Sequence, residues 1–177
     1  YENMLQQVQS LANVDRVEPR TSVTARTRQG DLALTGLEAQ TQFYQYHLIV
    51  GRWLTASESN TLVLSDLAAQ KLHLQVGETL TLTEDTRQVT WRIVGIVHDL
   101  NVSGGIGEAF TTLENMNTNL QRLPADSMMM LMVRAHNRSE DAVNQLAGQV
   151  NSTLSGLGGQ AQVTTLQEMT AQVQSVD

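Results

Sequence analysis

The sequence of 177 residues predicts an α+β fold, in which an α/β layer is interrupted by a smaller strand-rich insertion. Helical periodicity marks the beginning and the end of the chain, and short strand signals separated by turns fill its middle. The composition, 41% hydrophobic and 16% charged, suits a packed core and excludes a disordered chain. A chain of this length forms one domain or two small subdomains.

The chain begins with a helix and a strand hairpin. One helical face collects the apolar residues Met4, Leu5, Val8, Leu11 and Ala12. Residues 14–27 then have the pattern of an extended strand, in which Pro19 indicates an edge or a bend. The turn signal at 29–31 joins this strand to a returning strand at 32–35, so the two strands are expected to pair.

The middle of the chain is rich in strands. Strand signals occur near residues 61–65, 79–84, 89–97 and 109–112. Ser65 has the side chain and the position of an N-cap for a short helix over 66–72. A second short helix is expected over 113–120.

The last third contains a methionine-rich run and a long helix. The run Met128-Met129-Met130-Leu131-Met132-Val133 is short, which predicts a buried strand over 127–133. Apolar spacing predicts an amphipathic helix that begins after the N-cap Ser139 and ends at Gly158-Gly159. A strand at 161–165 and a helix that opens with a Thr165/Glu168 capping box are expected to follow.

Both ends of the sequence lack the signals that finish a domain. The chain starts with Tyr1 inside a helical pattern, and no Gly or Pro stops the last helix before Asp177. We therefore expect a fragment of a longer protein, in which the absence of a targeting signal carries little information. No run of about 18 apolar residues, the length that spans a bilayer, occurs in the sequence.

The charge balance argues against several classes of partner. Eleven Lys and Arg residues stand against 18 Asp and Glu residues, which gives a net charge of −7. This excess argues against nucleic-acid binding, which needs cations to displace counterions, and against docking on anionic lipid. Aromatic residues make up only 4%, too few for base-stacking platforms. The absence of cysteine excludes disulfides and thiolate metal sites and indicates no compartment.

The sequence predicts no catalytic, cofactor or metal site. Its histidines lie in separate elements without ligand spacing, and His98-Asp99 reaches Glu108 only if the chain folds back across a glycine loop. That loop, Gly104-Gly105-x-Gly107, lacks the phosphate-binding pattern, so we interpret it as a surface loop. The thioethers of the methionine run are soft copper ligands, but they alternate between two strand faces, which favours core packing.

Five segments between residues 51 and 96 follow one another in an order that resembles the extracytoplasmic domain of MacB-type, FtsX-like ABC transporter permeases. They are Gly51-Arg52-Trp53, Leu62-Val63-Leu64, Ala68 to Leu72, Gly77-Glu78-Thr79-Leu80 and Ile93-Val94-Gly95-Ile96. Upstream, Thr35-Gly36-Leu37-Glu38 is similar to the family's Gly-x-Asp-Pro turn, with Ala39 in place of the proline. Each segment alone is common, so the resemblance rests on all five in order.

The resemblance implies two subdomains and a mechanical role. Residues 1–35 and 121–177 would form a discontinuous, porter-like α/β sandwich, and residues 36–120 an inserted strand-rich subdomain, called Sabre in this family. The domain would lie on the extracytoplasmic side of the bacterial inner (cell) membrane and catalyse no reaction. It would transmit ATP-driven movement of transmembrane helices to a substrate or a partner protein.

The resemblance also implies partners. These are the transmembrane helices of the full-length chain, a cytoplasmic ATPase, a second permease copy, and a periplasmic adaptor or substrate protein. Relatives serve in drug or toxin efflux, in lipoprotein extraction or in the control of cell-wall hydrolases, and no residue of this sequence selects one of these.

Each motif residue also has a structural interpretation. Positive φ or a close backbone approach is expected at Gly51, Gly77 and Gly95. Arg52 is expected to pair with a carboxylate, for which the candidates are Glu58, Asp66 and Glu78. Trp53 and Trp91 are expected to anchor the core, with a partner contact as the alternative for one of them.

The loops at 40–47 and 101–107 are the candidates for contact with a partner, because they carry aromatic side chains and glycines. The candidate contact residues are Phe43, Tyr44, Tyr46, Gly104 and Gly105. Two other functions stay open at this stage: a stand-alone extracytoplasmic module that binds a small ligand or a peptide, and a hydrolase with a non-standard site. The first requires a ligand-sized pocket, and the second requires a nucleophile and a base that converge.

Overall fold

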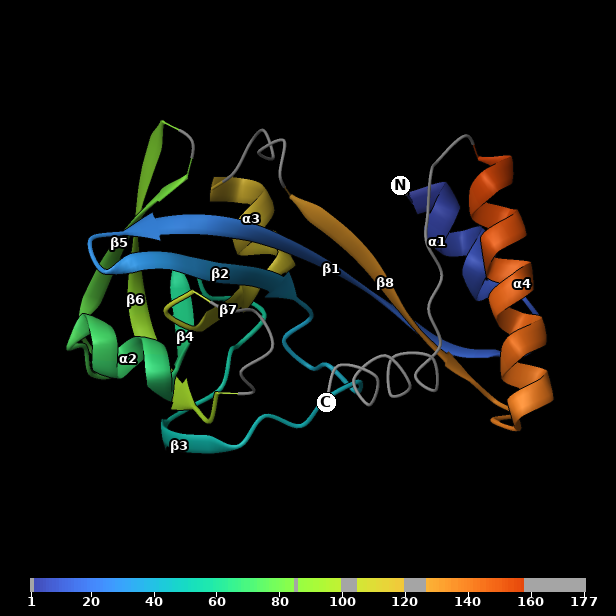
Figure 1. Ribbon diagram of the computed structural model, residues 1–177, viewed down its shortest axis with the longest axis horizontal. Helices are drawn as coiled ribbons and strands as arrows, with labels where there is room; N and C mark the ends of the chain where they lie inside the picture. Colours follow the sequence, from blue (N-terminus) through green and yellow to red (C-terminus); the bar gives the residue numbers. More distant parts are fainter. Residues whose placement is uncertain (1, 85, 100–104, 120–126, 158–177) are drawn as a thin grey trace. The chain divides into compact units, whose positions relative to one another are not determined.

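The computed structural model describes residues 2–84, 86–99, 105–119 and 127–157, which hold eight strands and four helices (Figure 1). The chain divides into two compact units, one made of Tyr1–Val17 and Met132–Asp177 and the other of Glu18–Leu131. The α+β class expected from the sequence is confirmed. The porter-like and Sabre-like division, expected over 1–35 with 121–177 and over 36–120, remains a prediction.

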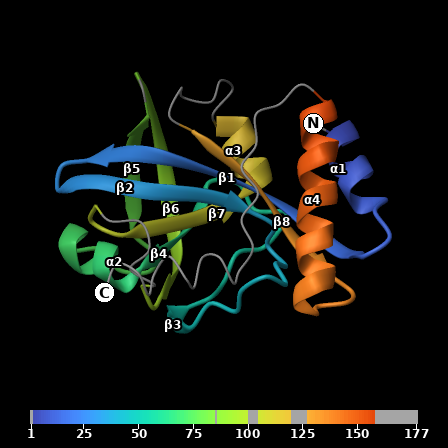
Figure 2. The ribbon, with the colours of Figure 1, turned by 45° about the vertical axis from the view of Figure 1, so that its right-hand side comes forward.

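Two helices pack against each other in the first unit. They are α1 (Glu2–Gln9) and α4 (Glu140–Gly156), and Figure 2 shows them side by side. Val8 of α1 and Leu146 and Val150 of α4 are buried, as the helical spacing predicts. The first helix ends three residues before the expected apolar face does, in a turn.

Ser139 caps α4 as the sequence predicts, because its hydroxyl accepts a hydrogen bond from the Ala142 amide at 3.3 Å. The expected helix stop at Gly158-Gly159, the strand at 161–165 and the helix after it all lie outside the described residues.

The beginning of β1 (Val14–Thr27) and the end of β8 (Met128–Ala135) belong to the first unit. An asparagine clasp joins the chain at these two places. Asn13 accepts a hydrogen bond on its side-chain oxygen from the Asn137 amide at 2.7 Å, and its side-chain nitrogen donates to the Asn137 carbonyl at 3.1 Å. The side chain of Asn13 thereby satisfies both backbone groups of Asn137, a residue distant in sequence.

Six strands of the second unit form a closed ring. Besides β1, this unit contains β2 (Gly30–Leu37), β3 (Leu48–Gly51), β4 (Thr61–Ser65), α2 (Asp66–Leu72), β5 (Thr79–Glu84), β6 (Arg87–Val97), β7 (Glu108–Thr112) and α3 (Leu113–Asn119). Around the ring, the order is β1, β2, β7, β4, β6 and β5, and β5 meets β1 again at the pair Thr83–Arg26. Both parallel and antiparallel pairs occur.

The ring closes around a core to which all six strands contribute. Its buried side chains include Val23, Ala25, Leu32, Leu34, Leu62, Leu64, Leu80, Leu82, Trp91, Ile93 and Ala109. These positions alternate along each strand, as they must when one face of a strand points inward. Trp91, which is fully buried, is the core anchor expected from the sequence.

A second cluster covers the outer face of three of these strands. Val63 of β4, Val94 of β6 and Phe110 of β7 lie between the inward-facing residues and pack with Leu37, Leu54 and Val97. Because both of its faces are covered, β4 is buried at every position. Strand β4 therefore reads as a continuous apolar run in the sequence.

The hairpin, the strands and both short helices of this unit appear where the sequence places them. Ser65 caps α2, since its hydroxyl accepts from the Ala68 amide at 3.3 Å, and His73 ends the helix in a left-handed conformation with φ 54°. Strand β3 was not predicted. It has four residues and all of them are exposed, so it carries no alternation signal.

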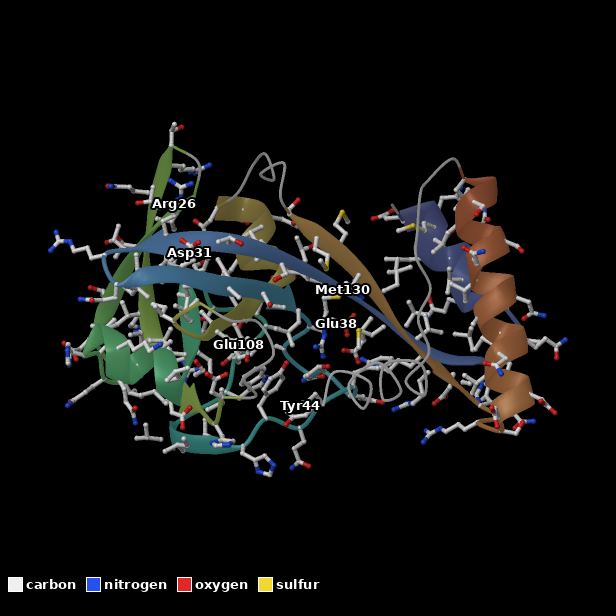
Figure 3. All side chains as sticks on the ribbon, viewed as in Figure 1. Arg26, Asp31, Glu38, Tyr44, Glu108 and Met130 are labelled. Atoms are coloured by element: carbon white, nitrogen blue, oxygen red, sulfur yellow. The ribbon has the colours of Figure 1, made fainter. Side chains whose placement is uncertain are left out.

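The methionine run is a strand, but the prediction that it is buried is wrong. The exposed fractions of Met128, Met129 and Met130 are 60%, 53% and 37%. Figure 3 shows the Met130 side chain on β8. An apolar run in the sequence indicates only that the side chains are hydrophobic. It does not indicate whether another element of the fold covers them.

Strands β3 and β6 approach more closely than side chains allow. Gly51 of β3 lies opposite Gly95 of β6, and the next residue, Arg52, donates its amide to the Val94 carbonyl at 2.9 Å. A Cβ on Gly95 would overlap the Arg52 carbonyl oxygen, and one on Gly51 would overlap the Val94 carbonyl oxygen. Gly51 also has φ +78°, which favours glycine.

We predict that Gly95→Ala lowers the free energy of unfolding by about 1–3 kcal/mol, because the new methyl group must displace the Arg52 backbone. Urea unfolding followed by circular dichroism measures this loss. Gly148→Ala is the control: nothing lies within 4 Å of its added Cβ, and in a helix the change stabilises by up to about 1 kcal/mol. A Gly95→Ala variant as stable as the wild type would contradict the close approach.

Candidate functional site

The segment after β2 carries the aromatic residues that the sequence proposes for partner contact. Tyr44 is 36% exposed, whereas Phe43 and Tyr46 are half-buried. We call residues 38–47 the aromatic loop. It belongs entirely to the second unit.

An aromatic cluster holds this loop against the ring. Tyr46 stacks on Trp53 with ring centroids 4.6 Å apart and an interplanar angle of 14°, and it also contacts Phe110 at 4.7 Å. Tyr44 meets Tyr46 edge-on at 4.7 Å. The Trp53 indole donates to the Ala39 carbonyl at 2.7 Å, which ties the start of the loop to the segment after β3. Burial raises the pKa of the Tyr46 hydroxyl.

Polar side chains of β1 fix the other side of the aromatic loop. The carboxylate of Glu18, which is fully buried, accepts a hydrogen bond from the Gln42 amide at 2.8 Å. The Arg20 guanidinium donates to the Thr41 hydroxyl at 3.3 Å. A hydrogen bond from a backbone amide to a carboxyl oxygen fixes the backbone at that residue, so this contact restricts the loop.

A shallow hollow of about 510 Å³ lies on the aromatic loop. Its lining comprises Ala39, Thr41, Gln42, Tyr44, Gln45, Tyr46 and Trp53. This lining contains no Asp, Glu, His, Lys or Arg side chain. The hollow offers aromatic surface together with side-chain amides that can donate and accept hydrogen bonds.

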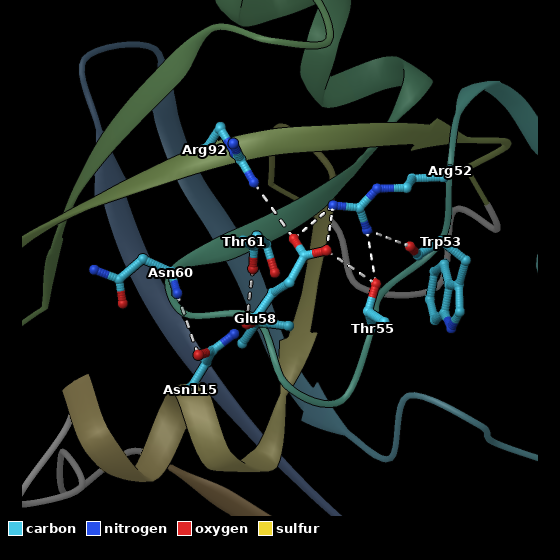
Figure 4. Close-up of polar contacts among 9 residues, drawn as sticks. Arg52, Trp53, Thr55, Glu58, Asn60, Thr61, Arg92 and Asn115 are labelled. Atoms are coloured by element: carbon cyan, nitrogen blue, oxygen red, sulfur yellow. Dashed lines mark hydrogen bonds and ion pairs between the residues drawn. The ribbon is translucent and has the colours of Figure 1, made fainter.

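An ion cluster braces the segment after β3, and Figure 4 shows its contacts. One guanidinium nitrogen of Arg52 donates to Glu58 Oε1 at 2.7 Å and also contacts Oε2. The other donates to the Thr55 hydroxyl at 2.9 Å and to the Trp53 carbonyl at 3.1 Å. Arg92 of β6 approaches Glu58 Oε2 at 3.4 Å. Of the three carboxylates considered from the sequence, Arg52 therefore pairs with Glu58.

The same segment is anchored at its far end by asparagines. Asn60 has φ 55°, and its amide donates to the Asn115 side chain at 3.2 Å. The Asn119 side chain donates to the Asn60 side chain at 2.7 Å. The Thr111 hydroxyl donates to the Thr61 carbonyl at 2.9 Å, which secures the beginning of β4. The segment between β3 and β4 is thus held at both ends.

The structure brings together only some of the residues singled out in the sequence. The crossing of β3 and β6 brings together Gly51, Arg52, Trp53 and Gly95. Gly77 has φ +95° and donates its amide to the Ile93 carbonyl at 2.8 Å. Gly105 lies elsewhere, against Asp31 at the hairpin turn. Figure 3 shows Asp31 well apart from Tyr44. Gly104 lies outside the described residues.

The described residues contain no group of three or more His, Cys, Asp or Glu side chains that would hold a metal ion. His98 Nδ1 lies 3.5 Å from Asp66 Oδ2. Sequence reasoning missed two features of this region: the role of Glu18, and the exposed strand β3.

No helix among the described residues is both long enough and apolar enough to cross a membrane.

One family model and several solved structures are similar to this chain. The family model described as MacB-like periplasmic core domain matches residues 1–152. The extracellular domain of the noncanonic ABC-type transporter YknZ from Gram-positive bacteria is similar in structure, with a TM-score of 0.63 and 15% identity over 93% of this chain and 88% of that chain. No curated protein sequence matches significantly.

Two further solved structures are similar. The periplasmic region of MacB from Actinobacillus actinomycetemcomitans gives a TM-score of 0.57 and 16% identity, over 85% of this chain and 72% of that chain. A domain of a putative permease protein from Porphyromonas gingivalis gives 0.53 and 15%, over 85% and 68%. At these identities the likeness shows a shared fold.

We predict that Glu58→Gln destabilises the chain at neutral pH and not in acid. The hydrogen bond from Arg52 holds the pKa of Glu58 below its ordinary value of 4.5 in the folded state. Because the pKa of Glu58 is lower in the folded than in the unfolded state, its ion pair stabilises the folded state fully at pH values above the unfolded-state pKa. This stabilisation is lost as the pH falls through the folded-state pKa. Thermal unfolding from pH 7 down to pH 2 should therefore show wild type and variant converging in acid.

The control for this series is Asp31→Asn, which removes an exposed carboxylate at the hairpin turn. A difference between wild type and Glu58→Gln that stays constant across the whole pH range would contradict the ion pair as its cause.

We predict that the two tyrosines of the aromatic loop differ in effect. Tyr46→Ser should lower the free energy of unfolding by about 2–4 kcal/mol, because it removes packing on Trp53 and Phe110. Tyr44→Ser should cost about 1 kcal/mol or less, because more of its ring already faces water. Urea unfolding measures both, and equal losses would show that Tyr44 also serves the core.

Proposed function

This chain belongs to the family of MacB-like periplasmic core domains, and from that premise we propose that it transmits movement across its two units. The resemblance noted in the sequence is thereby confirmed, and the chain is a periplasmic or extracellular domain of a MacB-type ABC transporter permease. In this proposal, ATP-driven movement of transmembrane helices enters through the unit that holds residues 1–17 and 132–177. It leaves through the strand-rich unit, toward a substrate or a partner protein.

One observation carries the proposal: two strands pass from one unit into the other without a break. Strand β1 contributes Val14–Val17 to the first unit and Glu18–Thr27 to the second, and β8 contributes residues to both in the same way. A strand rises roughly 3.3 Å per residue, close to the limit of an extended chain. Such a connection cannot lengthen under load, whereas a loop can.

The partners follow from the same proposal. The transmembrane helices of the full-length chain would deliver the movement, a cytoplasmic ATPase would drive it, and a second permease copy would complete the transporter. A periplasmic adaptor or a substrate protein would receive the movement. ATP hydrolysis would take place in the ATPase. The hollow on the aromatic loop, with Tyr44 as its most exposed aromatic side chain, is one candidate surface for contact with the partner.

We predict that flexible inserts in both strands uncouple transport from ATP hydrolysis. A Gly-Ser-Gly-Ser insert is placed between Val17 and Glu18, and a second one between Leu131 and Met132, in the complete permease with its ATPase. Transport should be lost while ATP hydrolysis continues, because the inserts turn two extended connections into extensible ones. Transport and hydrolysis are measured together in reconstituted membranes.

The control carries the same insert between Arg28 and Gln29, at the exposed turn of the hairpin. This control should keep both activities. Each strand insert is also made singly, so that a failure of the double variant to assemble does not end the test. Full transport by the assembled double variant would overturn the proposal.

A further inference from the structure

Strand β3 exposes three adjacent apolar side chains. The exposed fractions of Leu48, Ile49 and Val50 are 46%, 57% and 48%. Within the described residues β3 pairs with β6 alone, so its other edge faces no strand. Edge strands of soluble domains usually carry charged side chains that prevent pairing with other chains, and β3 carries none.

The ladder between β3 and β6 contains an irregularity at the centre of this apolar strand. Leu48 lies opposite Val97 and Val50 opposite Ile96, which leaves Ile49 without a partner in the register. A bulge of this kind re-aims a side chain and commonly occurs at a binding site. Ile49 is also the most exposed of the three residues.

An open groove of about 490 Å³ runs between β3 and α2. Ile49 and Val50 line it from the strand, Ala69 from the helix, and Leu74 and Ile96 complete its apolar part. Helix α2 is fixed at its start by the Ser65 cap and at its end by His73. An edge strand beside a helix, with a groove between them, is the arrangement in which an extended peptide adds to a sheet and places alternate side chains in the groove.

The charge of the groove selects the chemistry of its occupant. Asp66 is the only carboxylate that lines it, and His73 is the only lining side chain that can carry a positive charge, since neither Lys nor Arg lines it. Two backbone amides, those of Leu67 and Asp99, donate to Asp66 Oδ1 at 2.9 Å and hold the carboxylate in place. Asp66 Oδ2 lies 3.5 Å from His98 Nδ1, and the Asp66 side chain is 30% exposed. A cation on the occupant would therefore be stabilised here.

We propose that the groove between β3 and α2 binds an extended segment of a partner protein, with apolar side chains at alternating positions followed by a basic one that meets Asp66. This deepens the proposed function and rests on it, because the partner is the protein that receives the movement. The segment would pair with the open edge of β3 and cover Leu48, Ile49 and Val50.

A second copy of this chain fits the groove less well. Each copy carries a net charge of −7, so two copies repel each other. A four-residue strand also buries far less than the roughly 1,200 Å² that stable association of two domains needs. A basic peptide segment, in contrast, is attracted by the net charge of −7.

The test uses the labelled peptide Ser-Val-Thr-Ile-Thr-Lys-Ser and the 177-residue chain. Fluorescence anisotropy should show saturable binding, and amide resonances of residues 48–51 and 66–75 should shift. Ile49→Thr should weaken binding about fivefold, through lost apolar contact. Asp66→Asn should weaken it about two- to fivefold, since the amide oxygen still accepts from the backbone but the charge is gone. A peptide with Glu in place of Lys should bind more weakly by a similar factor.

The control variant is Met129→Thr, which removes an equally exposed apolar side chain away from the groove and should leave binding unchanged. Binding that fails to saturate, or that shifts the aromatic loop in place of β3, overturns the proposal. Sedimentation that shows a dimer of the chain, lost in Ile49→Thr, overturns it in favour of a second copy. The titration needs no transporter, so its failure leaves the strand-insert experiment standing, and the reverse also holds.

Discussion

Closure of the six-strand ring is the constraint on which the second unit depends. Once β5 meets β1, every strand of the ring has a neighbour on each side, and the inward side chains of all six form one core. Strand β6 has a central place in the sheet, because its eleven residues pair with β4, β5 and β3. Among the described strands, the open edges therefore belong to strands outside the ring, and β3 is one of these strands.

A ring filled from the inside still has an apolar outer face to cover. On β4, β6 and β7 the residues between the core positions are Val63, Val94 and Phe110, and they would face water without the aromatic loop and the segment after β3. This explains why so many contacts fasten those two segments: the Trp53–Ala39 hydrogen bond, the Glu18 contact and the Arg52–Glu58 brace. The glycine crossing lets β3 lie close enough for the cover to fit.

The sequence predicts the elements of the ring well and its surface poorly, for a physical reason. Turn residues, alternation and helix caps are local, so the hairpin, β4 to β7, Ser65 and Ser139 could be located by pattern. Whether an apolar side chain is covered depends on elements far away in the sequence. The methionines of β8 were therefore expected inside and lie exposed, and Tyr46 was a contact candidate although it packs on Trp53. Strand β3, short and exposed, gave no signal at all.

These outcomes change which surface a partner is expected to use. The aromatic loop contains the side chains that usually dominate protein interfaces, but most of its rings are engaged with one another and with Phe110. Strand β3 has less conspicuous residues whose apolar area remains uncovered, beside a groove with a fixed carboxylate. Energy gained on binding comes from surface that loses water at that moment. By this criterion Ile49 and its neighbours have more to gain than Tyr46 or Trp53.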